Sequence, residues 1–99
     1  MRKPLVAGNW KMNLLVADAV DLVSALKPAV QDVSGVDMIV CPTFPALYAV
    51  GQALQGSNVE MGGQNTYNKE SGAYTGETSP QMLLDVGCSW VIIGHSERR

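Results

Sequence analysis

The sequence contains little of several residue types, and each shortage excludes a class of protein. Its two cysteines, Cys41 and Cys88, form no C-x-x-C pair, so we expect reduced core thiols of an intracellular protein and no metal site. The seven lysine and arginine residues are scattered and the formal net charge is −2, which argues against nucleic-acid binding. No apolar run approaches the roughly 20 residues of a membrane span, and the short run after Pro4 is no signal peptide. We therefore expect a soluble, cytoplasmic chain without a membrane partner.

The chain does contain a regular alternation of apolar and amphipathic segments, in a composition typical of one small globular domain. Pro28 is expected to end or kink the first helix, and Thr78 with Gln81 has the form of a capping box at the third. Strands that alternate with helices predict parallel βαβ units with right-handed crossovers. The prediction is an α/β sheet in the order 1-2-3-4 with every helix on its convex side. Strands are expected over residues 4–10, 36–41, 58–63 and 90–93, and helices over residues 16–27, 43–56 and 78–87.

The last ten residues place the only histidine directly after an expected strand. Trp90 to Ile93 are bulky and apolar without interruption, which predicts a strand buried on both faces of a parallel sheet. His95 follows at the carboxyl end, where ligands bind in sheets wound with helices. Ser96 and Glu97 resemble a helix start, and a helix N-terminus favours a neutral imidazole that donates a hydrogen bond. The alternative is a buried histidine satisfied by backbone groups.

Asn9 and Lys11 lie at the end of the first expected strand. With a side-chain period of two they share one face, so an amide and an ammonium project together from the carboxyl end. The alternative is a lysine that extends into solvent and an asparagine that makes a turn. Gln64 and Asn65 follow the third strand in the same way, so all candidate side chains, including His95, lie at strand carboxyl ends.

Residues 66–77 form a polar connection of about a dozen residues, longer than wound domains usually have. Such loops are commonly functional or intermolecular. A merely solvated loop is the alternative.

Three longer motifs resemble the triosephosphate isomerase family. Their order and spacing fit the N-terminal part of that family, and the resemblance runs from one end of the chain to the other. It implies a (β/α)₈ TIM barrel, a homodimer, and interconversion of dihydroxyacetone phosphate and glyceraldehyde 3-phosphate without a metal or cofactor. The motifs are Ala7-Gly8-Asn9-Trp10-Lys11-Met12-Asn13, Gly72-Ala73-Tyr74-Thr75-Gly76-Glu77 and Ile93-Gly94-His95-Ser96-Glu97-Arg98-Arg99.

The resemblance also implies roles for individual residues. Asn9 and Lys11 would contact the phosphorylated triose, with Lys11 placing a positive charge by the phosphate and the developing enediolate. His95 would be the catalytic electrophile that polarises the carbonyl and moves protons between the two oxygens. Glu97 would complete the catalytic set as a supporting acid near Lys11. The loop that enters the neighbouring subunit in the family dimer is matched here by Thr75, Gly76 and Glu77.

The chain departs from the family in length, since a (β/α)₈ barrel takes roughly 250 residues. We expect residues 1–99 to be the N-terminal half of a TIM-barrel domain, an incomplete domain with four parallel strands, three helices and the start of a fourth. The carboxylate base, the closing lid and the later phosphate-binding loops would lie outside it, so the chain alone is expected to be inactive. Two open sheet edges and an uncovered inner face are also expected.

Two other hypotheses belong to different classes. The chain could be a catalytically inactive half-barrel that serves only in folding or assembly, by pairing with a complementary half or with itself. Another phosphosugar barrel enzyme, such as an aldolase, is less favoured because Lys11 is the only strand-borne lysine suited to Schiff-base chemistry.

Overall fold

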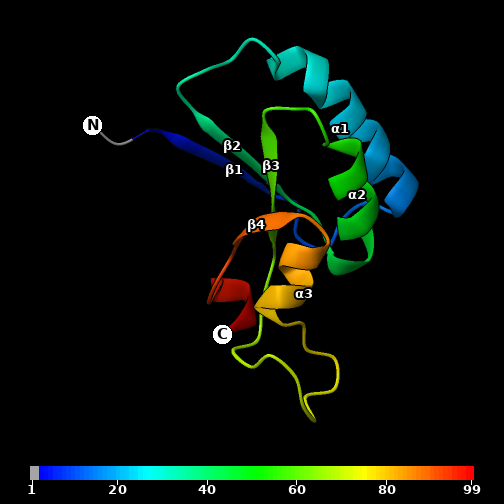
Figure 1. Ribbon diagram of the computed structural model, residues 1–99, viewed down its shortest axis with the longest axis vertical. Coiled ribbons are helices and arrows are strands. Elements are labelled where there is room, and N and C mark those ends of the chain that lie inside the picture. Colours follow the sequence, from blue (N-terminus) through cyan, green and yellow to red (C-terminus); the bar gives the residue numbers. More distant parts are fainter. Residues whose placement is uncertain (1–2) are drawn as a thin grey trace.

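The computed structural model describes residues 3–99 and contains one sheet of parallel strands (Figure 1). The sheet order is β1-β2-β3-β4, so the expected order and direction are confirmed. The strands are β1 Leu5–Asn9, β2 Asp37–Cys41, β3 Val59–Gly63 and β4 Cys88–Val91. The helices are α1 Val16–Val30, α2 Leu47–Ala53 and α3 Pro80–Asp85, with 3₁₀ turns η1 Phe44–Ala46 and η2 Ser96–Arg98.

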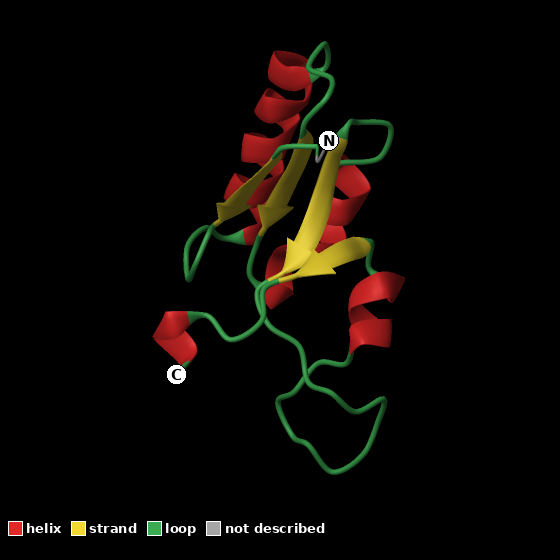
Figure 2. Cartoon of the chain, turned by 90° about the vertical axis from the view of Figure 1, so that its left-hand side faces the viewer, coloured by secondary structure: helices red, strands yellow, loops and turns green. Residues whose placement is uncertain are grey.

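One face of the sheet carries the helices and the hydrophobic core. The helices α1 and α2 lie behind the strands in Figure 2, and all three α-helices contribute side chains to the core. On the edge strand β1, by contrast, Leu5 and Val6 are 51% and 61% exposed. The apolar surface that helices do not cover therefore faces solvent within the described chain. The largest fully buried side chains are Met61, Val23, Val50 and Pro42.

The fourth strand differs from the expectation in extent and in burial. It begins at Cys88 and ends at Val91, and does not span residues 90–93. Trp90 is 40% exposed and Ile93 is 77% exposed, so the expected burial on both faces is wrong. The physical reason is that the contacts of β4 with β3 and α3 leave Trp90 and Ile93 partly open to solvent.

The first helix continues through Pro28 to Val30, so of the two expected effects of the proline, an end or a kink, the end is wrong. A proline in the last turn removes one backbone donor, but Leu26 and Val30 still pack against the core on either side of it. Asn58 donates through Nδ2 to the carbonyls of Val30 at 2.8 Å and Val33 at 3.1 Å. These bonds satisfy acceptors that the helix end leaves free.

Ser79, and not Thr78, caps α3. Ser79 is buried, and its Oγ accepts a hydrogen bond from the backbone N–H of Met82 at 3.2 Å. Thr78 is engaged through its carbonyl, which accepts from the Tyr67 N–H at 2.8 Å and from the Thr66 hydroxyl at 3.1 Å. These contacts close the base of the 66–77 loop and leave the next residue to cap the helix.

The second expected helix is present in a shorter regular form. It begins as the 3₁₀ turn η1 after Thr43 and becomes α-helical only over Leu47–Ala53.

Within residues 3–99, no helix combines the length and the apolar character needed to cross a bilayer.

Candidate active site

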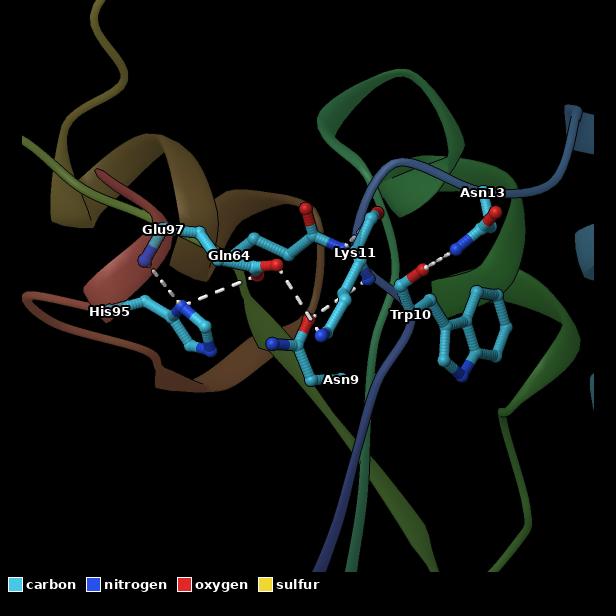
Figure 3. A network of polar contacts seen from close by, with 7 residues as sticks. All are labelled: Asn9, Trp10, Lys11, Asn13, Gln64, His95 and Glu97. Atoms are coloured by element: carbon cyan, nitrogen blue, oxygen red, sulfur yellow. Dashed lines mark hydrogen bonds and ion pairs between the residues drawn. The ribbon is translucent and has the colours of Figure 1, made fainter. Parts of the chain in front are cut away.

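Polar side chains from three strand ends surround one cleft (Figure 3). Asn9 ends β1 and Lys11 follows it, while Gln64 directly follows β3 and His95 follows β4. Together with Glu97 they line an open cleft of about 510 Å³. Because the strands are parallel, their carboxyl ends share one edge, and residues far apart in the sequence meet there.

Lys11 extends across the cleft to Glu97. Its Nζ lies 3.4 Å from Glu97 Oε2, and the two side chains are 56% and 57% exposed. Solvent screens such a pair, so the contact adds little to the stability of the fold. The backbone of Lys11 has φ +56°, a left-handed conformation that a residue with a Cβ seldom adopts. The distance between Lys11 Nζ and Glu97 Oε2 shows that Glu97 lies near Lys11, as expected.

His95 caps the turn η2 with its own ring. Nδ1 accepts a hydrogen bond from the backbone N–H of Glu97 at 3.1 Å. The helix start expected at Ser96 and Glu97 is thus a 3₁₀ turn, and its N-cap is His95 and not the Ser96 hydroxyl. A backbone N–H can only donate, so Nδ1 carries no proton and the ring is neutral with its proton on Nε2. Glu97 Oε1 also lies 3.4 Å from Nδ1. Since both atoms are then acceptors, this second contact is not an ion pair.

The imidazole is half-buried at the cleft, with 31% of its side chain exposed. Figure 3 shows Nε2 on the edge of the ring that faces away from the bond to Glu97. The alternative of a histidine satisfied by backbone groups therefore holds for one ring nitrogen only. The other edge presents an N–H donor at the cleft.

Asn9 makes a turn and also faces the cleft. Its Oδ1 accepts from the Lys11 N–H at 2.9 Å, which is the local turn that the sequence left open as an alternative. The same bond fixes the amide orientation, and Figure 3 shows Nδ2 on the side of His95. One side chain thus shapes the Lys11 backbone and presents a donor.

Two further amides hold the segment that carries Lys11. Gln64 Nε2 donates to the carbonyls of Lys11 at 2.7 Å and Cys41 at 2.9 Å. Asn13 Nδ2 donates to the Trp10 carbonyl at 2.7 Å. The sequence placed Gln64 at a strand end but gave no sign of these partners, because they lie more than 20 residues away.

The loop residues do not join this cleft. The segment between β3 and α3 projects beyond the sheet (Figure 2). Within it, the rings of Tyr67 and Tyr74 pack in a tilted arrangement with their centroids 4.7 Å apart. The loop has internal contacts of its own, including a bond from the Glu77 N–H to the Tyr74 carbonyl at 2.9 Å. The positions expected at a dimer interface, Thr75, Gly76 and Glu77, are all exposed.

Cys41 and Cys88 are buried free thiols. Burial raises the pKa of both, and that of Cys88 reaches about 11 with a smaller contribution from Cys41. Neither is a thiolate nucleophile near neutral pH. Among residues 3–99, no three side chains of the kinds that bind metals come together in a possible metal site.

Sequential parallel strands backed by helices, with a polar cleft at their carboxyl edge, define the class as α/β proteins of the barrel type. A family model described as Triosephosphate isomerase matches residues 4–99. The chain belongs to the triosephosphate isomerase family.

Individual relatives agree with this assignment. The triosephosphate isomerase of Endomicrobium trichonymphae is 57% identical over 99 residues, which are all of this chain and 40% of that protein. The one from Carboxydothermus hydrogenoformans is 54% identical over all of this chain and 39% of its own length. The crystal structure of triosephosphate isomerase from Bartonella henselae superposes with a TM-score of 0.91 at 37% identity, covering 99% of this chain and 40% of that chain. The chain thus spans about 40% of the length of the relatives that it matches.

Proposed function

We propose that residues 1–99 form the N-terminal half of a triosephosphate isomerase barrel and carry half of its active site. The complete enzyme would interconvert dihydroxyacetone phosphate and D-glyceraldehyde 3-phosphate through an enediolate, in the cytoplasm and without a cofactor. The observation that carries the proposal is the shared cleft of Asn9, Lys11 and a neutral His95.

Lys11 and Asn9 form the binding part of this half-site. The ammonium of Lys11 would attract the phosphate and the charge that develops on the enediolate, since a fixed positive charge stabilises anions most where water is excluded. Asn9 would donate through Nδ2, the amide group that its turn leaves unused. Both groups lie at the carboxyl edge of the sheet, where barrel enzymes bind their substrates.

A neutral imidazole suits the proposed proton transfers. The Nε2–H of His95 would donate to the substrate carbonyl oxygen, which becomes more negative as a base removes the neighbouring proton. The same ring could then pass a proton from one enediolate oxygen to the other. Nδ1 is engaged by the Glu97 N–H, so Nε2 is the ring nitrogen left to act on the substrate.

The base that removes the carbon-bound proton is proposed to lie outside this chain. Glu97 is the carboxylate of the cleft among residues 3–99, and its Oε2 is held 3.4 Å from Lys11 Nζ. We assign Glu97 a supporting role for this reason. A positioned base contributes roughly 10²–10⁴-fold, so this chain alone is expected to turn over near the uncatalysed background.

The 66–77 loop is proposed to enter a second copy of the complete enzyme. Its base is closed by backbone bonds, and its exposed residues Thr75, Gly76 and Glu77 project away from the sheet. A loop that is ordered before binding loses little conformational freedom on docking. A homodimer built in this way is consistent with the exposed polar character of the loop.

The test is a complementation assay. The 99-residue chain is combined with the part of the Endomicrobium trichonymphae relative that follows the matched region, joined or as a separate polypeptide. Isomerisation is followed by a coupled assay in preparations free of host isomerase, with His95→Ala and Lys11→Met as matched controls. We expect turnover only in the combined protein, and its loss in both variants. Turnover by the chain alone that disappears in His95→Ala would contradict the assignment of the base.

A second candidate function is an inactive assembly module. The observation that favours it is the apolar surface left open on β1 and after β4, where Val6 is 61% and Ile93 is 77% exposed. Sedimentation at several concentrations separates the two proposals. A chain that self-associates strongly but gains no activity with the complementary part would favour the module.

A further inference from the structure

The backbone of Lys11 is held in an unusual conformation by contacts on both of its peptide groups. Its φ of +56° is left-handed, and a β-carbon disfavours that region. On one side, the Lys11 N–H donates to Asn9 Oδ1 at 2.9 Å. On the other side, the Lys11 carbonyl accepts from Gln64 Nε2 at 2.7 Å. The first contact is local, whereas the second reaches across the sheet.

The amide of Gln64 ties three strand ends together. Its Nε2 carries two hydrogens, which meet the carbonyls of Lys11 after β1 and of Cys41 at the end of β2. Gln64 itself directly follows β3. Both partners are carbonyl oxygens, so only a side chain with donors fits between them. A carboxylate of the same shape would place an acceptor against two acceptors.

The contact between the Lys11 and Glu97 side chains is too weak to set the position of the Lys11 ammonium. The Lys11 and Glu97 side chains are 56% and 57% exposed, and solvent screens the pair. The Lys11 backbone therefore fixes the point and the initial direction from which the side chain that carries the ammonium extends.

We propose that Gln64 is a positioning residue that holds the left-handed Lys11 backbone, and thereby places the Lys11 ammonium where the anionic group of the substrate binds. This inference rests on the proposed function of the cleft. It gives Gln64 no contact with substrate.

The test uses two substitutions at one site in the combined protein described above. Gln64→Met keeps the length of the side chain and removes both donors without adding charge. Gln64→Glu keeps the shape and removes both donors at pH 8, but regains one donor when its carboxyl is protonated. Two neighbouring carbonyl acceptors raise the pKa of such a carboxyl, so its protonation lies within an accessible range. Gln52→Glu, at an exposed position of α2, is the matched control for the added charge.

At pH 8 we expect both Gln64 variants to bind inorganic phosphate and substrate less tightly than the Gln52→Glu control, by roughly 10- to 100-fold, because small displacements of a binding group are costly. As the pH falls from 8 to 5.5, the loss of phosphate affinity in Gln64→Glu relative to the control should become smaller. The loss in Gln64→Met should stay constant. A glutamine that only stabilised the fold would leave the phosphate affinity of the folded protein equal to that of the control at pH 8.

Two results would overturn the inference. One is phosphate affinity in both Gln64 variants equal to that of the control, and the other is a Gln64→Glu deficit that does not change with pH. Lys11→Met separates this failure from that of the proposed function. If Lys11→Met weakens phosphate binding and the Gln64 variants do not, only the inference on Gln64 fails. If Lys11→Met itself has no effect, the proposed function fails as well.

Discussion

Replacing Gly51 by alanine should destabilise the fold, although alanine is the better helix former. Gly51 lies inside α2, and a β-carbon there would stand 2.5 Å from the Val86 carbonyl oxygen and 3.2 Å from Met61 Cε. Val86 is the C-cap of α3, so the helices meet at this glycine without room for a side chain. The nearest obstacle is main-chain oxygen, which cannot rotate away as the methionine methyl can.

The expected size follows from two opposing terms. Alanine in place of glycine within a helix gains about 1 kcal/mol from helix propensity. Overpacking at a rigid contact costs about 1–3 kcal/mol. The steric term is the larger one, so we expect a net loss of the order of 1 kcal/mol in the free energy of unfolding.

Urea unfolding followed by tryptophan fluorescence measures this loss. With m-values of about 1–3 kcal/mol/M, the midpoint should fall by roughly 0.3–1 M at unchanged m. Gln52→Ala, at the exposed neighbouring position, is the matched control and should stay within about 0.5 kcal/mol of the parent. A Gly51→Ala protein that is as stable as the parent, or more stable, would refute the argument from close packing.

Three further substitutions test the core, the cap and the buried thiol. Leu83→Ala should lose about 2–5 kcal/mol because Leu83 is 4% exposed, whereas Leu84→Ala, at 66% exposure, should stay within about 0.5 kcal/mol in the same urea experiment. Ser79→Ala should lose about 1 kcal/mol by removing the cap of α3, and Thr78→Ala clearly less, as thermal unfolding would show. Burial raises the pKa of Cys88 above the ordinary 9.0 to about 11. The protonated thiol therefore makes its full contribution to the free energy of unfolding below pH 9, and this contribution is lost as the pH rises toward 11. The loss from Cys88 is up to roughly 2–3 kcal/mol. Cys88→Val should show a smaller alkaline slope, with the contribution of the buried Cys41 thiol remaining, and equal slopes in the two proteins would contradict the argument.

The sheet and the placement of the candidate site could be predicted because both follow from local patterns. Short apolar runs bounded by glycine and proline define the first two strands closely, and Gly56 with the paired glycines Gly62 and Gly63 marks the third. Alternation with helices makes the strands parallel. Parallel strands share a carboxyl edge, so Lys11 and His95 had to lie at the same end of the sheet if each followed a strand. The structure brings them to one cleft. Their catalytic roles stay predictions.

The wrong predictions concern the bounds of β4 and the cap of α3. In both cases neighbouring residues are equally suitable locally, and contacts with distant parts of the chain decide between them. The apolar run from residue 90 to 93 does not say which residues pair with β3. The structure pairs Met61 with Cys88, Gly62 with Trp90 and Gly63 with Val91, so β4 begins earlier than the run and ends inside it. Thr78 and Ser79 are both capable of capping, and the bonds to the Thr78 carbonyl from the loop leave Ser79 as the cap.

Stability and chemistry are carried by different parts of this chain. The core lies between the sheet and the helices, whereas Lys11 and His95 lie beyond the strand ends with 56% and 31% of their side chains exposed. Removing an exposed polar group away from the core costs little, so variants at these two residues should remain folded and lose function alone. Gln64 is the exception, because its amide joins backbone groups of three strand ends while it holds Lys11. A strained lysine can persist at the edge of the sheet because the surrounding backbone, and not the lysine itself, supplies the contacts that fix it.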